Sequence, residues 1–290
     1  MTDYRTQTVP VDSGELTVGV WGDEGPLVVA VHGITSHHLA WALVGADLAA
    51  DHRFVAPDLR GRGHSRDLPG PYGMAQHAAD LAAVIAAYGG MATVVGHSMG
   101  GWAAVELARA YPMLVDRLVL VDGGPALPPL PGVPADPTED EITAVVAETI
   151  GHAYRRLTLT FPDHEAYRAT WRAHPSFADW TETMTAYVDY DLVADAGGLR
   201  PACRLEAALR DARDLYAWRP VAPAPLPVPA VFLRAERGMF DQPEGMIAPG
   251  AATRAFPGIA ESDVPGTNHY TIVLAAKGAA EVAGAVRRLS

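Results

Sequence analysis

The residues best suited to do chemistry are a serine framed by two glycines, in the sequence Gly96-His-Ser98-Met-Gly100. A serine hydroxyl is exposed for nucleophilic attack when it projects from a sharp turn between a strand and a helix. Small residues two positions before and after it let the two backbones approach closely. Residues 92–96 form an apolar run typical of a buried strand, and residues 100–111 have helical spacing. We therefore predict that Ser98 is the nucleophile of a covalent mechanism.

Two backbone amides are candidates for an oxyanion hole, which stabilises negative charge that develops on a substrate oxygen. The amide of Met99 lies at the start of the helix that follows Ser98, where free N–H groups favour an anion. The amide of Ile34 follows His32-Gly33, at the end of an earlier apolar run. A phosphate-binding loop is the alternative interpretation, but the lysine of a P-loop is absent and no G-x-G-x-x-G can be found here.

Alternating strand and helix patterns surround these residues. A parallel sheet buried on both faces gives continuous apolar strands, each followed by a helix. This order predicts a doubly wound, mostly parallel α/β sheet. The expected strands are residues 16–21, 27–32, 53–58, 92–96 and 118–122, and the expected helices are residues 39–50, 74–88 and 100–111.

Two proline-rich stretches interrupt this pattern. Residues 125–137 hold six prolines and residues 220–229 hold five, so neither stretch suits a helix interior or a central strand. Between them we expect only helices, at residues 138–157, 163–173, 177–192 and 205–215. A strand at 230–234, an extended piece at 261–264 and a helix at 271–288 complete the chain. We predict an α/β core of residues 1–124 and 226–290, with an all-helical insertion at 125–225.

Taken together, these motifs resemble the α/β-hydrolase superfamily. The resemblance rests on His32-Gly33, Asp58-Leu-Arg-Gly-Arg-Gly-His-Ser65, the serine motif and a late His269, and it covers the whole chain. It implies that the insertion is the cap, or lid, that this family carries. The stretch from Asp58 to Ser65 resembles a signature of the esterase and epoxide-hydrolase-like branch. We interpret it as a tight turn held by Arg60 and His64.

The resemblance implies the chain order serine, acid, histidine for a catalytic triad. His269 is the only histidine beyond His174, so it is the expected general base. Two residues compete for the acid. Asp122 ends a predicted strand beside that of Ser98, and Asp241 lies three residues after Gly238, which stands where the family usually has its aspartate. We favour Asp122, keep Asp241 as the alternative and rank Glu236 third.

Composition limits the partners and the compartment. The 290 residues carry a formal net charge of −12, so nucleic acid and anionic membrane are poor partners. One cysteine, Cys203, excludes an intramolecular disulfide and fits a packed thiol in a reducing compartment. No secretory signal or membrane-spanning run is found, so we expect a cytoplasmic protein. No motif for a metal or a cofactor is present, and we expect neither.

The substrate class follows from the insertion and the serine. Residues 138–218 hold ten of the 22 aromatic residues, which favours an apolar or aromatic small molecule. The predicted function is a serine hydrolase that cleaves an ester, thioester or lactone through an acyl-enzyme. A carbon–carbon bond hydrolase and a cofactor-free perhydrolase with the same triad remain alternatives. A hydrolase-like small-molecule receptor is the alternative from another class. The sequence leaves open whether the chain is a monomer or a homodimer.

Overall fold

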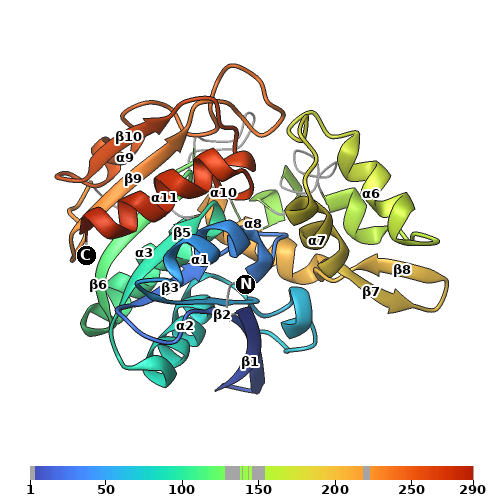
Figure 1. Cartoon of the computed structure of the whole chain (residues 1–290), viewed down its shortest axis with the longest axis horizontal. Coiled ribbons are helices and arrows are strands. Elements are labelled where there is room, and N and C mark those ends of the chain that lie inside the picture. The colour runs from blue at the N-terminus through green and yellow to red at the C-terminus, as the bar shows by residue number, and fades with distance from the viewer. Residues whose placement is uncertain are drawn as a thin grey trace.

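An eight-stranded sheet runs through the centre of the protein (Figure 1). The structure is a computed structural model, and it describes residues 4–127, 138, 140–142, 144, 145, 154–217 and 223–289. In order across the sheet, the strands are β1 (Tyr4–Val11), β2 (Gly14–Trp21), β4 (Arg53–Pro57), β3 (Leu27–Val31), β5 (Ala92–His97), β6 (Val115–Val121), β9 (Ala230–Ala235) and β10 (Ala260–Val264). β2 pairs antiparallel with β1 and with β4, and the strands from β4 to β10 are parallel.

Helices cover both faces of this sheet. Side chains alternate along a strand, so Val29 and Val31 pack with α2 and α3 while Val28 and Ala30 pack with α1 and α11. Figure 1 shows α1 and α11 lying across the same face. The doubly wound sheet predicted from the sequence is therefore confirmed. The helices of the core are α1 (Ala42–Leu48), α2 (Met74–Tyr88), α3 (Met99–Ala110), α9 (Ala251–Ala255), α10 (Thr271–Leu274) and α11 (Ala276–Leu289).

Residues 154–217, which follow β6 and precede β9 in the chain, lie outside the main sheet, and most of their elements are on the right of Figure 1. We call residues 154–217 the inserted segment. It contains the helices α6 (His164–Arg172), α7 (Glu182–Tyr190) and α8 (Leu205–Ala217) and the antiparallel pair β7 (Leu192–Asp195) and β8 (Gly198–Pro201). The expectation of an all-helical insertion is therefore wrong. The Gly197-Gly198 turn, with φ of +143° at Gly198, lets the chain reverse between two short strands.

Other boundaries also differ from the expectation. β1 was not expected, since its side chains are mostly exposed and it has no continuous apolar run. The final helix is broken at Ala275, which is extended. The helix expected at 177–192 begins at Glu182, with the Thr181 side chain accepting from the Met184 amide. Half of the helix expected at 138–157 lies outside the described residues, but the Thr138–Glu141 capping box is present, with Thr138 N–H donating to Glu141.

Candidate active site

Ser98 occupies a sharp turn between β5 and α3. Its backbone has φ 52° and ψ −128°, a conformation that a residue with a side chain rarely adopts. The turn is fixed on both sides, because Ser98 N–H donates to the Val121 carbonyl at 3.0 Å and the Ser98 carbonyl accepts from Gly101 N–H at 2.8 Å. The strained backbone therefore holds the side chain at the carboxyl edge of the sheet.

Close backbone contacts explain the glycines around this turn. A methyl group on Gly96 would lie 2.3 Å from the Gly100 carbonyl oxygen, and one on Gly100 would lie 2.1 Å from that of Val31. A methyl group on Gly123, after β6, would lie 2.1 Å from the Ser98 carbonyl oxygen. Only glycine fits these positions without moving the backbone. The small residues are thus required by the approach of β3, β5, α3 and β6 to one another.

Three predicted residues from distant parts of the chain meet at this edge. The Ser98 hydroxyl lies 3.1 Å from His269 Nε2, and His269 Nδ1 lies 2.7 Å from Asp122 Oδ2. Asp122 is fully buried, and its other carboxylate oxygen accepts from the Ala235 amide at 3.2 Å. Its backbone, with φ 46°, is fixed by a bond from its N–H to the Leu233 carbonyl. The Asp122 carboxylate is therefore held in place independently of His269.

Asp241, the alternative acid, has other partners. Its Oδ1 accepts from Arg237 Nε at 2.9 Å and from Asn268 Nδ2 at 3.1 Å. The bonds from Asn268 and Arg237 hold the pKa of Asp241 below its usual value. Asn268 in turn accepts from the backbone amides of Tyr270 and Thr271 at the start of α10. Asp241 thus supports the loop that carries His269, and no bond between its carboxylate and that imidazole is found among the described residues.

The loop after β3 lies directly against Ser98. A methyl group on Gly33 would be 3.2 Å from Ser98 Cβ, which places the predicted oxyanion loop beside the serine. His32 fixes this loop, with Nδ1–H donating to the Gly33 carbonyl at 2.7 Å and Nε2 accepting from Leu59 N–H at 3.0 Å. Burial lowers the pKa of His32 to about 3, so the ring stays neutral at physiological pH. Arg62 Nε donates to the Ile34 carbonyl at 2.9 Å and so fixes the next peptide as well.

His97 supports the loop that carries His269. Its Nε2–H donates to the His269 carbonyl at 2.8 Å, and the two rings lie 4.8 Å apart. Burial, together with the neighbouring His269, lowers the pKa of His97 well below its usual value. This bond joins β5 to the loop that carries His269. No pattern along the chain pointed to the backbone of His269 as the partner of His97.

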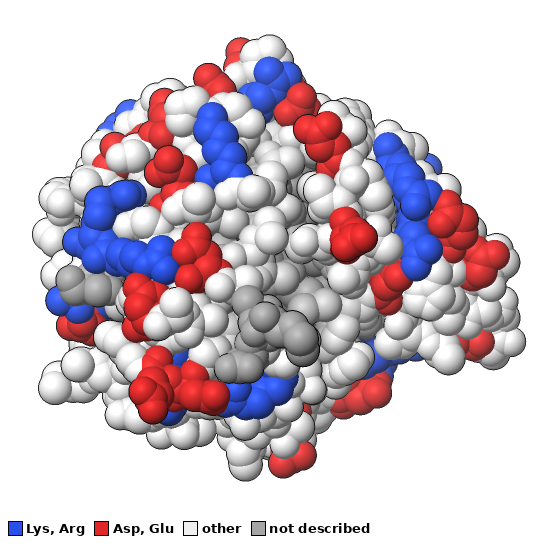
Figure 2. All heavy atoms as spheres, viewed as in Figure 1, with Lys and Arg blue, Asp and Glu red and all other residues white. Residues whose placement is uncertain are grey.

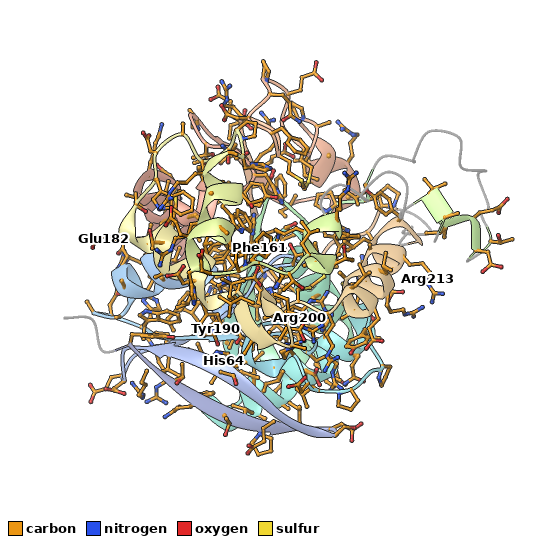
Figure 3. All side chains as sticks on the ribbon, turned by 90° about the vertical axis from the view of Figure 1, so that its right-hand side faces the viewer. His64, Phe161, Glu182, Tyr190, Arg200 and Arg213 are labelled. Carbon is orange, nitrogen blue, oxygen red and sulfur yellow. The ribbon has the colours of Figure 1, made fainter. Side chains whose placement is uncertain are left out.

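The turn from Asp58 to Ser65 is held mainly by Asp58. Its buried carboxylate accepts from His38 Nδ1 and from the backbone amides of His38 and His64. Burial opposes the charge of Asp58, but His38 outweighs it, so its pKa is lowered. Arg60 pairs with Asp80 through two bonds of 2.8 Å, as expected of a residue that holds the turn. The His64 side chain instead packs on Tyr190, at 4.3 Å between ring centroids (Figure 3).

The inserted segment contacts the loops that carry the site. Tyr187 of α7 donates to the Ser36 hydroxyl at 3.0 Å, and Tyr190 donates to Asp58 at 2.7 Å. Asn268 Nδ2 donates to the Ser176 carbonyl at 3.1 Å. Of the ten aromatic residues counted in this region, Trp218 lies outside the described residues. The buried ones are Tyr154, Phe161, Tyr167, Trp171, Phe177 and Tyr187.

Arg156 is a further residue at this contact, and the sequence offered no sign of it. It belongs to a short 3-10 turn (Arg156–Thr158), and its side chain is only 13% exposed. The preceding Arg155 has the same type, so the sequence alone does not separate the two. Cys203 is buried as expected, and burial raises its pKa to about 11. Within the described part of the chain, no group of side chains suits a metal ion.

The surface and the helices give two further observations. Basic and acidic side chains are interspersed on the face shown in Figure 2, without a field of one sign. Among the described helices, none is long and apolar enough to cross a membrane.

Curated relatives match this chain over different lengths. An uncharacterized protein of Mycobacterium tuberculosis is 40% identical over 103 residues, which are 34% of this chain and 30% of that protein. The chain thus matches less than a third of the length of the first curated relatives. The 2-(acetamidomethylene)succinate hydrolase of Mesorhizobium japonicum is 28% identical over 90% of this chain and 87% of its own. The N-formylmaleamate deformylase of Pseudomonas putida is 34% identical over 52% of this chain and 58% of its own.

Solved structures share the fold. The crystal structure of E-2-(acetamidomethylene)succinate hydrolase has a TM-score of 0.76 at 24% identity, over 99% of this chain and 98% of its own. A thioesterase domain from the curacin biosynthetic pathway has a TM-score of 0.71 at 23% identity, over 98% and 99%. At these identities the likeness shows the fold alone. The family model described as alpha/beta hydrolase fold matches residues 26–275, and the chain therefore belongs to that family.

Proposed function

We propose that this member of the α/β-hydrolase family is a hydrolytic enzyme with Ser98 as nucleophile, His269 as general base and Asp122 as the acid of the triad. One observation carries the proposal: the continuous hydrogen-bonded series from the Ser98 hydroxyl through the His269 ring to Asp122, with contacts of 3.1 and 2.7 Å. The rare backbone conformation of Ser98 supports it, because such strain persists where the surrounding structure over-determines it and is concentrated at functional sites.

In this proposal, His269 Nε2 accepts the Ser98 proton as the hydroxyl oxygen attacks an acyl carbon. The amides of Met99 and Ile34 donate to the oxyanion that forms, and the C–O bond to the leaving group then breaks as His269 returns the proton to that group. Water, activated by His269, hydrolyses the resulting acyl-enzyme. Asp122 accepts the Nδ1–H of His269 throughout, which fixes the tautomer and stabilises the charged ring.

The bond we expect to be cleaved is an ester, thioester or lactone of a small molecule with an apolar or aromatic body. A second candidate is an amide bond, since two of the relatives are named as a hydrolase of an acetamido compound and as a deformylase of an N-formyl compound. The inserted segment would act as the cap, because its aromatic side chains face the loops that carry Ser98 and His269. A carbon–carbon bond substrate would use the same triad.

A fluorophosphonate probe and a matched pair of substrates test this function. We expect the probe to label wild-type protein at Ser98, and Ser98→Ala to abolish both the labelling and the turnover of p-nitrophenyl butyrate. Comparing p-nitrophenyl butyrate with the p-nitroanilide of the same acid then separates ester from amide preference. Turnover of neither compound, with a ligand-induced change in intrinsic tryptophan fluorescence, would support a receptor instead.

A further inference from the structure

Arg156 is a largely buried cation of the inserted segment, at its contact with the loop after β3. Its Nη1 donates to Asp191, at 2.5 Å, and to the Tyr167 hydroxyl. Its Nη2 has one contact among the described residues, 3.4 Å from the hydroxyl of Thr35. Thr35 follows Ile34, whose amide we assign to the oxyanion hole. One edge of the guanidinium is therefore directed at the oxyanion loop.

On its other side, Arg156 is connected through Trp171 to the loop that carries His269. Its guanidinium carbon lies 4.7 Å from the centre of the Trp171 ring, and Trp171 packs edge-on against Tyr270 at 6.3 Å. Tyr270 directly follows His269. Arg156 thus lies between Thr35 on one side and the Trp171–Tyr270 pair on the other. Thr35 and Tyr270 belong to the two core loops that meet at Ser98.

The pairing of Arg156 differs from that of other arginines in the described structure. Arg60, Arg168 and Arg234 each donate through two nitrogens, Nε and Nη2, to both oxygens of one carboxylate. Such two-pronged pairing uses the planar fork of the guanidinium fully. Asp191 instead engages Arg156 through one oxygen on one nitrogen, although Asp191 is buried and Arg156 is only 13% exposed. The Nη2 edge of Arg156 is left with a long contact to a neutral hydroxyl.

The charge of Arg156 is secure despite its burial. Burial opposes the charged form, but Tyr167 and Asp191 outweigh it and raise the pKa. Charge-assisted hydrogen bonds are strongest where water is excluded, so an anionic group placed beside this guanidinium would be bound strongly.

We propose that the Nη2 edge of Arg156 binds a carboxylate of the substrate, at the end remote from the bond that Ser98 attacks. The substrate class is then an acyl compound with a second, free carboxylate, such as the half-ester or half-amide of a dicarboxylic acid. This inference rests on the proposed function of Ser98. It revises the expectation of a largely apolar or aromatic substrate, because Tyr167 and Trp171 pack on a cation.

Half-esters and diesters of the same acids test the proposal. We would measure kcat/KM for monomethyl and dimethyl esters from succinate to suberate, since the best chain length matches the separation of Ser98 and Arg156. For at least one length, the wild-type protein should prefer the half-ester by roughly tenfold to a hundredfold, the size of one charged hydrogen bond. A wild-type protein that prefers the neutral diester at every length would overturn the proposal without any variant.

Substitutions assign the preference to one side chain. Arg156→Gln should remove the preference for the half-ester, because it should lower half-ester turnover by roughly tenfold to a hundredfold more than diester turnover, which gains no charged hydrogen bond from this side chain. Arg156→Lys should keep part of it, since the charge remains but the fork does not. The control is Arg168→Gln, which removes an arginine of the same segment that pairs with Asp189, and it should leave the preference unchanged. An equal loss of both activities in Arg156→Gln would show a structural role only.

A binding measurement separates this inference from the proposed function. Ser98→Ala protein should bind monomethyl adipate in isothermal titration calorimetry, and the double variant Ser98→Ala/Arg156→Gln should bind it at least about tenfold more weakly. Equal binding by both proteins would overturn the role of Arg156 even if Ser98 is the nucleophile. Conversely, unchanged turnover in Ser98→Ala would overturn the proposed function, while the calorimetry still reports on Arg156.

Discussion

The edge of the sheet that carries Ser98 and the inserted segment that faces it are built in different ways. At the sheet edge, glycines let backbones touch, and each partner of His269 is fixed by further backbone bonds. In the inserted segment, buried rings and charged side chains make the contacts, and Arg156 retains an edge with one long contact to Thr35. In the proposed function, the first arrangement fixes the reacting atoms, and the second presents side chains to the substrate.

This difference suggests a division of roles. Groups that move protons must be held to within a fraction of an ångström, which backbone packing achieves. Groups that select a substrate need matching charge and shape, which side chains from another segment supply. Substitutions at the sheet edge should therefore lower turnover of every substrate, whereas substitutions in the inserted segment should change the choice among substrates.

The largest effect should come from Ser98→Ala. Without the hydroxyl no acyl-enzyme forms, so we expect kcat to fall by about 10⁴-fold or more. The measurement is initial-rate kinetics with p-nitrophenyl butyrate, and circular dichroism should show an unchanged fold. The control is Ser262→Ala, an exposed serine in β10, which should keep full activity. If Ser98→Ala were as active as the wild-type protein, the reaction could not take place at this edge of the sheet.

Next in size is the contrast between Asp122→Asn and Asp241→Asn. Asparagine at position 122 favours the wrong tautomer of His269, so kcat should fall by about 10⁴-fold. Asparagine at position 241 weakens bonds within a supporting loop, so the loss should stay within about tenfold. Both are read from the same kinetics. The reverse order would make Asp241 the acid and would require the loop to rearrange.

A third contrast compares two glycines. A methyl group at Gly100 meets the Val31 carbonyl oxygen at 2.1 Å, so Gly100→Ala should lower the free energy of unfolding by about 3 kcal/mol. At Gly197, in the turn of the inserted segment, the methyl group would meet only Thr160 Cγ2 at 3.8 Å. Gly197→Ala should change stability by less than about 0.5 kcal/mol. Urea unfolding measures both, and equal effects would contradict the contrast in packing.

The smallest effect concerns acid stability. Burial lowers the pKa of His32, at the sheet edge, and of His37, beside Tyr187, to about 3 in each case. Below about pH 6.5 the unfolded chain binds protons that these rings do not bind until near pH 3, so the folded state loses stability as pH falls through that window. Each ring contributes a slope of about 1.4 kcal/mol per pH unit.

His37→Phe should therefore make the free energy of unfolding less steep in pH between about pH 6 and pH 4. The measurement is urea unfolding at several pH values. His164→Phe is the control, because the side chain of His164, in the inserted segment, is 48% exposed. A slope that stays the same in His37→Phe, or that changes equally in His164→Phe, would contradict the role of burial.

Local sequence was sufficient for most of the core and for much of the site. The apolar runs of β3, β5 and β6 predicted buried parallel strands, and the glycines around Ser98 predicted the sharp turn. β1 escaped prediction because it lies at the edge of the sheet with exposed side chains. The pair β7 and β8 was not predicted, because strands of four residues are too short to show a recognisable alternation of apolar and polar side chains.

Contacts between distant residues were beyond local patterns. Asp122 ends one predicted strand and Asp241 follows another, so both were candidates for the acid. Only the folded structure shows which of the two carboxylates bonds to the His269 ring. The bond from His97 to the His269 backbone and the position of Arg156 beside Thr35 join residues more than 100 positions apart. Such contacts depend on how the segments pack, which spacing along the chain does not specify.

The most direct test of the account is to trap the covalent intermediate. Wild-type protein is mixed with p-nitrophenyl acetate, quenched with acid within milliseconds and analysed by peptide mass spectrometry. We predict one added acetyl group on the peptide that contains Ser98, formed at the rate of the p-nitrophenol burst. An acetyl group on any other residue, or a burst without an acetyl group on Ser98, would contradict the assignment of Ser98 as the nucleophile.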